Sequence, residues 1–145
     1  MLRRKMTLKP YKPKGFSDLG LTRIAVTIRK FDSEESFTST FLVDTGAIDS
    51  MVPASELRKL GIQPVRKELY EMASGELEEF ELGFAEISFL GKSVPNQVMF
   101  GPDDCEPILG VLALEAAGFV VDPVAERLKT LPARSLKALA LKSVA

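Results

Sequence analysis

The sequence contains no histidine and no tryptophan, and Cys105 is the single cysteine among its 145 residues. Without histidine, the chain cannot form a Ser-His-Asp or Cys-His nucleophile pair, an HExxH zinc helix or an imidazole proton shuttle. One cysteine closes no intramolecular disulfide and supplies no thiolate-rich zinc site. Any catalysis must therefore use carboxylates, amines or hydroxyls, and we expect no metal, no cofactor and no catalytic role for Cys105, a buried or loop thiol.

The chain also lacks a strong charge of either sign, because 19 Lys and Arg oppose 20 Asp and Glu. A net charge of -1 disfavours nucleic-acid binding through phosphate neutralisation. The most apolar stretch, Ile108 to Val121, is interrupted by Glu115 and is shorter than the roughly 18 residues of a membrane-spanning helix. The N-terminal cations are not followed by the apolar segment of a signal peptide. We therefore expect a cytoplasmic protein without a nucleic-acid or membrane partner.

The length is typical of one domain with a substantial core. Residues 1–15 contain six cations, two prolines and no acid, a composition that resists packing and predicts a basic flexible arm. The patterned part of the chain predicts a single domain over residues 16–132. The remaining residues, 133–145, form a C-terminal tail whose spaced apolar side chains are compatible with a loose amphipathic helix.

The first half of the domain is patterned as β-hairpins. Polar and β-branched residues alternate from Leu19 to Arg29, and Phe37 to Val43 is rich in Thr, Phe and Val. The polar cluster Asp32 to Ser36 between them is typical of a turn. These two segments predict an antiparallel hairpin.

A short helix is expected next, opened by Pro53 and ended by Gly61. After it, Gln63 to Met72 is expected to be extended, and the return strand spans Leu77 to Leu82. The turn of this second hairpin is Ser74-Gly75.

The rest of the domain continues the strand pattern. Strands are expected at 83–90 and 93–100, split by Gly91, and a short buried strand at 108–110. A small helix over about 112–117 ends at Gly118, and a last hairpin joins 119–121 to 127–129 through Asp122-Pro123. The pattern thus predicts an all-β domain with one or two short helices.

The strongest chemical signal is Asp44, which directly follows the apolar residues Phe41 to Val43 and precedes Thr45 and Gly46. An ionised carboxylate in a buried position is costly. The cost falls if the carboxylate meets a second one in a water-filled cleft, shares a proton with it and accepts backbone N–H bonds. Such a pair acts as general acid and general base on one water molecule, which requires neither metal nor histidine.

Several segments together resemble the retroviral-like, pepsin-type aspartic proteases of clan AA, and within them the small prokaryotic single-domain members. The segment Phe-Leu-Val-Asp-Thr-Gly-Ala at 41–47 is similar to the catalytic signature of that family. Ser-Met-Val-Pro at 50–53, Pro-Ile-Leu-Gly-Val at 107–111 and Gly-Phe-Val-Val-Asp-Pro at 118–123 are similar to segments that follow it. Retroviral members often carry Asp where this chain has Leu112, which indicates the prokaryotic branch. The resemblance spans roughly residues 19–132.

This resemblance implies a closed barrel of the retropepsin-like acid protease type, acting as an endopeptidase on peptide or protein substrates. Bilobed members carry two Asp-Thr/Ser-Gly motifs, whereas this chain has one. The resemblance therefore implies a homodimer in which two Asp44 side chains meet on a two-fold axis.

The resemblance also implies roles for neighbouring residues. Thr45 would hydrogen-bond across the axis, Gly46 would allow close approach of the backbone, and Ala47 would line the cleft. Ser74 and Gly75 would form the tip of a flap that closes over substrate. The segment Ile108, Leu109 and Gly110 would pack behind the catalytic loop.

Two other functions stay open at this point. One is a catalytically silent peptide-binding or dimerisation module of the same fold. The other, a nucleic-acid adaptor, is least favoured because the basic arm is short and has Tyr11 as its one stacking residue. Other acids have simpler interpretations. Asp49, Asp103 and Asp104 are expected to be solvated loop residues without EF-hand spacing, and the glutamates of 68–81 a solvated strand face.

Overall fold

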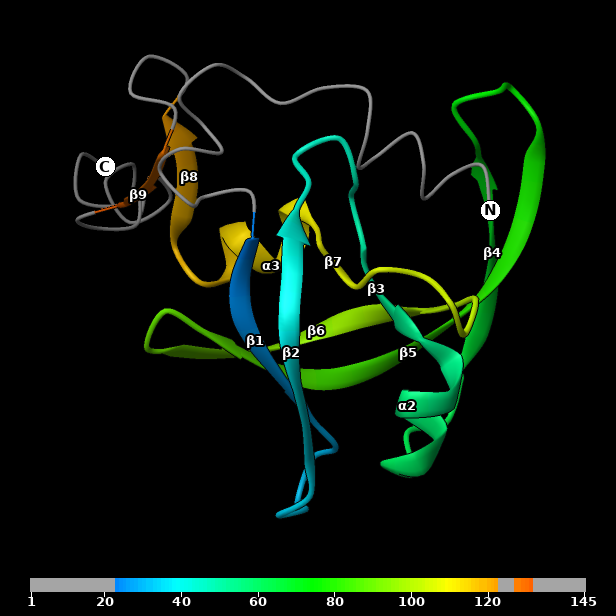
Figure 1. Ribbon diagram of the computed structural model, residues 1–145, viewed down its shortest axis with the longest axis horizontal. Coiled ribbons are helices and arrows are strands. Elements are labelled where there is room, and N and C mark those ends of the chain that lie inside the picture. The colour runs from blue at the N-terminus through cyan, green and yellow to red at the C-terminus, as the bar shows by residue number, and fades with distance from the viewer. Residues whose placement is uncertain (1–22, 123–126, 132–145) are drawn as a thin grey trace, which may run out of the picture.

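The computed structural model describes residues 23–122 and 127–131 (Figure 1). The predicted arm, the predicted tail and the beginning of the first predicted strand lie outside these residues. The elements along the described chain are β1 (Arg23–Arg29), β2 (Ser36–Val43), β3 (Ser50–Pro53), α2 (Ala54–Lys59), β4 (Arg66–Glu71), β5 (Leu77–Phe89), β6 (Lys92–Gly101), β7 (Ile108–Leu109), α3 (Val111–Ala116), β8 (Phe119–Asp122) and β9 (Arg127–Thr130).

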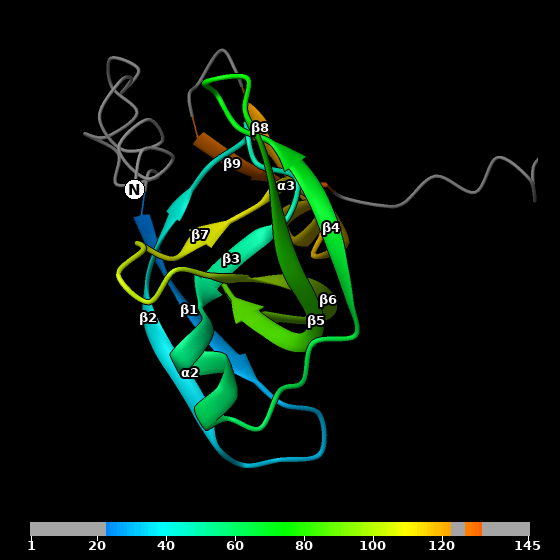
Figure 2. The ribbon, with the colours of Figure 1, turned by 90° about the vertical axis from the view of Figure 1, so that its right-hand side faces the viewer.

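Seven of these strands form one sheet in the order β1-β2-β7-β3-β6-β5-β4. Strand β1 also pairs with β5, so the pairings of six strands return to their starting point. Strand β4 lies outside this circuit, at the edge of the sheet beside β5. Figures 1 and 2 show the strands curving around a common centre, with the β4–β5 hairpin extending from it. The prediction of an all-β domain with short helices is confirmed.

The predicted hairpins are present. Strands β1 and β2 pair antiparallel from Arg23 with Leu42 to Arg29 with Ser36, and β4 pairs antiparallel with β5 from Arg66 with Leu82 to Glu71 with Leu77. Strands β8 and β9 form the last predicted hairpin, whose connecting residues 123–126 lie outside the described chain. Alternating polar and apolar side chains therefore indicated the local pairings correctly.

The expected division of the chain at Gly83 is wrong, because β5 runs unbroken through this residue. A Cβ atom at position 83 would lie 2.8 Å from the carbonyl oxygen of Gln63 and 3.1 Å from the Phe100 ring. Glycine at this position therefore allows a neighbouring segment to approach the strand closely and does not mark a turn. The long strand consequently pairs with β4 near its beginning and with β1 and β6 further along.

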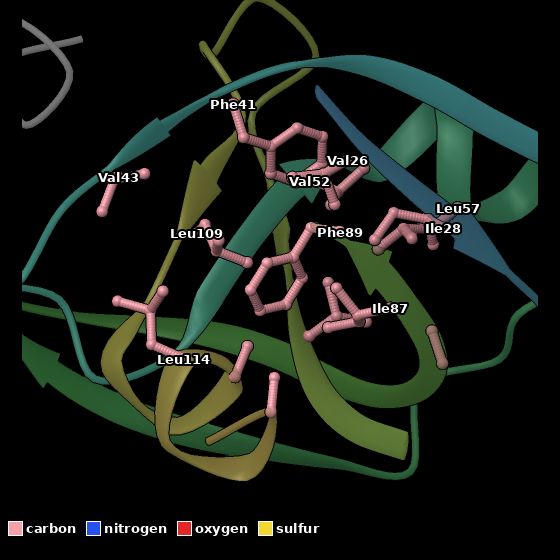
Figure 3. Close-up of a cluster of buried hydrophobic side chains, with 14 of the residues drawn as sticks. Val26, Ile28, Phe41, Val43, Val52, Leu57, Ile87, Phe89, Leu109 and Leu114 are labelled. Atoms are coloured by element: carbon pink, nitrogen blue, oxygen red, sulfur yellow. The ribbon is translucent and has the colours of Figure 1, made fainter. Parts of the chain in front are cut away.

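The core fills the space enclosed by the strands. Figure 3 shows apolar side chains from several strands and both helices pointing toward one another, among them Val26, Phe41, Val52, Phe89 and Leu109. These five side chains are between 0% and 3% exposed. Residues distant in the sequence thus bury a common apolar surface, which is the main stabilising contribution to such a fold.

Each described helix has six residues, and the two lie apart from one another (Figures 1 and 2). The helix that begins after Pro53 is followed by Gly61 at φ 81°, and α3 is followed by Gly118 at φ 84°, as expected for glycines that end helices. Asp103 accepts a hydrogen bond of 2.9 Å from the backbone N–H of Ser55 in the first turn of α2. Within the described chain, no helix has the length and apolar character needed to cross a bilayer.

Candidate active site

Asp44 lies at the point where strand β2 leaves the core and the chain turns. Its backbone N–H donates to the carbonyl of Leu109 (3.1 Å), and its own carbonyl accepts from the N–H of Ala47 (3.1 Å). The backbone N–H of Gly46 donates to the carboxylate Oδ1 (2.9 Å). The loop therefore holds both the backbone and the side chain of Asp44 in a defined position.

Burial raises the pKa of Asp44 above its ordinary value, because removal of water disfavours the charged carboxylate. The hydrogen bond from Gly46 opposes this effect by stabilising the anion. Thr45 and Gly46, next in the chain, are exposed. The carboxyl group is therefore partly withdrawn from water, while the apex of its loop is accessible.

The segment at 108–111 lies directly behind this loop. Strand β7 pairs in parallel with the end of β2, placing Leu109 beside Val43. The N–H of Val111 donates to the carbonyl of Ala47 (2.9 Å), and the N–H of Gly110 donates to the hydroxyl of Ser50 (2.9 Å). A continuous set of backbone bonds thus fixes the Asp44 loop to the beginning of α3.

Gly110 permits this close packing because it has no side chain. A Cβ atom there would lie 2.6 Å from the carbonyl carbon of Asp49 and 2.7 Å from the carbonyl oxygen of Ile48. At Gly46, by contrast, a Cβ atom would meet the Asp44 carboxylate at 3.2 Å. The two glycines therefore serve different contacts, one with the loop backbone and one with the carboxylate.

Asp44 opens into a cleft of about 680 Å³. The cleft is bounded by the Asp44 loop, by the end of β4 with the turn that follows it, and by parts of β3, β5, β6 and β7. Most of its lining side chains are apolar: Ala47, Ile48, Met51, Leu69, Met72, Ala73, Phe80, Met99 and Ile108. Its remaining lining residues are Asp44, Gly46, Asp49, Glu68, Tyr70, Glu71 and Gln97, so none of the cationic side chains in the described part of the chain lines it. A cleft of this size and apolar character is typical of a ligand-binding site.

Residues of the β4–β5 hairpin, from Glu68 to Ala73 and Phe80, form part of the cleft lining. Its turn is closed by bonds from the N–H of Met72 to the carbonyl of Glu76 (2.7 Å) and from the N–H of Gly75 to the carbonyl of Met72 (2.8 Å). Gly75 has φ 92°, the left-handed conformation that glycine adopts without strain. Met72 and Ala73 line the cleft, whereas Ser74 and Gly75 lie in the exposed turn beyond them.

The expectation that Asp49 is a solvated loop acid is wrong, because this residue is 7% exposed. Its Oδ2 accepts a hydrogen bond of 2.6 Å from the Tyr70 hydroxyl, and its Oδ1 accepts one of 2.6 Å from the side-chain amide of Gln97. These bonds replace water around the buried carboxylate. Asp103 and Asp104 are exposed, as predicted.

Sequence reasoning also missed Tyr70 and Gln97 as part of the site. Burial and the bond to Asp49 raise the pKa of the Tyr70 phenol, so it stays protonated and donates at neutral pH. A weak signal was present in the sequence, because Asp49 lies two residues before the apolar segment Met51 to Pro53. An acid so close to a buried strand needs partners, but the sequence does not identify them.

Two other titratable groups have contacts of their own. Glu68, at the cleft, forms an ion pair with Arg66 at 3.4 Å, and Cys105 is a buried thiol. Among the described residues, no three Asp, Glu, Cys or His side chains gather as a set of metal ligands. The glutamates between positions 68 and 81 are exposed apart from Glu81, which is half-buried, in agreement with a solvated strand face.

No protein-family model matches the sequence. No curated protein matches it either.

Solved structures similar to this chain include viral and bacterial proteases. Simian foamy virus (mac) protease is 17% identical with a TM-score of 0.48, and the match covers 64% of this chain and 91% of that protein. A retropepsin-like aspartic protease from Rickettsia conorii is 24% identical with a TM-score of 0.41, covering 69% of this chain and 84% of that one. A foamy viral protease-reverse transcriptase bound to an RNA/DNA hybrid is 14% identical with a TM-score of 0.48, covering 85% of this chain and 14% of the larger protein. The sequence identities of these three structures to this chain lie between 14% and 24%.

Proposed function

We propose that this chain is an aspartic endopeptidase of the retropepsin-like type, which hydrolyses peptide bonds as a homodimer. The observation that carries the proposal is the Asp44 carboxyl group. It lies in a largely apolar cleft, accepts a backbone N–H from Gly46, and has a pKa raised by burial. A partly desolvated carboxyl group of this kind suits general acid–base chemistry on a water molecule.

The second carboxyl group of the dyad comes from a second copy of the chain. The 145-residue sequence has one Asp-Thr-Gly motif. The nearest acid along the chain, Asp49, already accepts hydrogen bonds on both oxygens. Because Thr45 and Gly46 are exposed beside Asp44, the loop apex is accessible to an identical loop across a two-fold axis. In that dimer Thr45 hydroxyls hydrogen-bond across the axis, while Gly46 and Ala47 border the cleft floor.

The proposed reaction uses one proton shared by two Asp44 carboxyl groups. The ionised carboxylate removes a proton from water, and the resulting hydroxide attacks the peptide carbonyl carbon. The protonated carboxyl group gives its proton to the carbonyl oxygen, which forms a tetrahedral diol. When the C–N bond breaks, the carboxyl group that took the water proton gives it to the amine nitrogen, and the ionised carboxylate takes a proton from a diol hydroxyl. The products are an amine and a carboxylic acid, and the two Asp44 groups again share one proton. Proximity of two carboxylates raises the pKa of one of them further, so activity falls where both ionise.

The finer parts of the fold belong to the same proposal. The closed circuit of pairings through β1, β2, β7, β3, β6 and β5 supports a closed barrel of the retropepsin type. The β4–β5 hairpin corresponds to the flap, with Ser74 and Gly75 at its tip. Closure of such a hairpin over a bound peptide excludes water from the reacting groups. In this arrangement Ile108, Leu109 and Gly110 hold the catalytic loop from behind.

The first experiment compares wild type with Asp44→Asn on a mixed peptide library between acidic and neutral pH. We expect cleavage by wild type that an aspartic-protease inhibitor suppresses, and no cleavage by Asp44→Asn, because an amide does not exchange the required proton. Glu35→Gln is the matched control, since it makes the same change of carboxylate to amide in an exposed turn. Full turnover by a folded Asp44→Asn protein would refute the assignment.

The second experiment tests the dimer. Wild type is mixed with about a threefold excess of Asp44→Asn chains and allowed to exchange subunits. Random pairing then leaves about one quarter of wild-type chains in wild-type dimers, so activity per wild-type chain falls to about one quarter. An active monomer would instead keep its activity per wild-type chain. Analytical ultracentrifugation at the assay concentration gives the corresponding mass.

The silent peptide-binding or dimerisation module is the alternative that these measurements separate from an enzyme. A module of this kind would form dimers and bind peptides without hydrolysing them, and its peptide binding would survive Asp44→Asn. Inhibitor-sensitive cleavage that depends on Asp44 would exclude it.

A further inference from the structure

The β4–β5 hairpin has little backbone attachment to the Asp44 loop. Strand β4 is an edge strand whose described backbone pairing is with β5 alone. Backbone pairing therefore leaves the distance between the hairpin and the Asp44 loop weakly restrained. Side chains must supply the remaining restraint.

Tyr70 provides such a contact. It lies on β4, and its hydroxyl donates to Asp49 Oδ2 at 2.6 Å. Its ring packs edge-on against Phe80 of β5, with ring centres 5.8 Å apart. The ring thus belongs to the hairpin, and the hydroxyl reaches the loop that carries Asp44. A hydroxyl bound to a carboxylate is among the stronger neutral-to-charged hydrogen bonds.

Asp49 is well fixed from the other side. The side-chain amide of Gln97 on β6 donates to its Oδ1 at 2.6 Å, and the Oε1 of the same amide accepts from Arg66 of β4 at 3.2 Å. Next to Asp49, the carbonyl of Ile48 accepts from the N–H of Leu112 at 3.1 Å. The carboxylate is therefore a fixed point to which the hairpin can be attached.

We propose that Tyr70 and Asp49 are positioning residues, whose hydrogen bond holds the β4–β5 hairpin at the cleft and prepares it to bind substrate. The substrate part of this inference rests on the proposed peptidase function. Neither residue takes part in the chemical step. Loss of the bond lets the hairpin move away from the loop, so it weakens peptide binding and leaves the Asp44 chemistry intact.

The test is Tyr70→Phe, which keeps the ring contact with Phe80 and removes the hydroxyl. Hydrogen exchange of the protein without substrate is measured over residues 66–77. We expect exchange there to accelerate by about tenfold or more, as follows from loss of a hydrogen bond to a charged group. In the peptidase assay we expect KM to rise by about fivefold or more, with kcat within about twofold of wild type.

Two further variants make the result specific. Thr38→Val removes a hydroxyl bond of 2.9 Å to Thr27 in the β1–β2 hairpin, which pairs with β5 but not with β4, and should change neither the exchange of 66–77 nor KM. Asp49→Asn retains an oxygen that accepts from Tyr70 but removes the charge. In that background, Tyr70→Phe should accelerate exchange by less than about threefold, because the bond it removes is weaker.

The inference is refuted if Tyr70→Phe leaves exchange over 66–77 unchanged, or if exchange rises equally in β1 and β2, which indicates general destabilisation. It is also refuted if kcat falls while KM is unchanged. Absence of any wild-type cleavage refutes the peptidase proposal instead, and the exchange data alone then decide whether the bond holds the hairpin.

Discussion

Replacement of Gly110 by alanine tests whether the segment at 108–111 supports the Asp44 loop through close backbone packing. Gly110 has φ -93°, a conformation that alanine adopts without strain. The added methyl group is therefore the main perturbation. It would lie 2.6 Å from the Asp49 carbonyl carbon and 2.7 Å from the carbonyl oxygens of Asp49 and Ile48.

The cost follows from what the methyl group meets. Ordinary contacts of such an atom begin at 3.4 Å, so each of the three contacts is too short by at least about 0.7 Å. All three atoms are backbone, and no side-chain rotation relieves the overlap. Overpacking of this kind costs about 1–3 kcal/mol, and we expect the upper end. Alanine also lowers the conformational entropy of the unfolded chain, which offsets about 0.4–1 kcal/mol of this cost. The net decrease in the free energy of unfolding is then about 2 kcal/mol.

The assay is denaturant unfolding at one protein concentration, because dimerisation makes apparent stability depend on concentration. A net loss of about 2 kcal/mol is a large part of the about 5–15 kcal/mol typical of folded domains. Gly46→Ala is the matched control, since its methyl group meets only the Asp44 carboxylate within 4 Å, at 3.2 Å. We expect it to change stability by less than about 1 kcal/mol and to lower peptidase activity. Equal stability of Gly110→Ala and wild type would refute the argument, as would an equal loss in Gly46→Ala.

Two further predictions concern stability. Burial raises the pKa of Asp44, so the folded state holds its proton to higher pH than the unfolded state does. This carboxyl group therefore lowers the stability of the fold progressively as pH rises from the pKa of the unfolded state through the raised pKa of the folded state. Asp44→Asn should therefore raise the Tm at neutral pH and leave it nearly unchanged near pH 3, as measured by thermal unfolding at matched protein concentration; a Tm gain of equal size at both pH values would contradict this. Asp103→Ala removes the acceptor of the Ser55 N–H in the first turn of α2 and should cost about 0.5–1 kcal/mol, while Asp103→Asn should restore most of the loss because it keeps an acceptor oxygen. Equal unfolding midpoints for the alanine and asparagine variants would exclude this capping role.

The sequence alone was sufficient for the local elements. Alternation and turn residues predicted the β1–β2 and β4–β5 hairpins, and the positions of Pro53, Gly61 and Gly118 predicted where the helices begin or end. These features depend on neighbours in the chain, through side-chain period and the conformational preferences of proline and glycine. The sequence also indicated Asp44 as the candidate catalytic residue, because it directly follows an apolar strand.

Contacts between distant segments required the tertiary structure. Strand β3 pairs in parallel with β6, and strand β7 lies between β2 and β3. The sequence does not predict these pairings, because strands of four and two residues are too short to carry a clear pattern. The sequence predicts two strands that divide at Gly83, whereas the structure has one. The contact between Gly83 and the Gln63 carbonyl cannot be read from the residues around position 83.

Asp49 shows the same distinction at the site. Its sequence neighbours do not identify any hydrogen-bond donor, and whether such a carboxylate is solvated or buried depends on donors that the fold brings to it. Tyr70 and Gln97 are 21 and 48 residues further along the chain. The identity of a single residue determines its capacity to accept hydrogen bonds, whereas the three-dimensional packing of distant strands determines which donors replace its water.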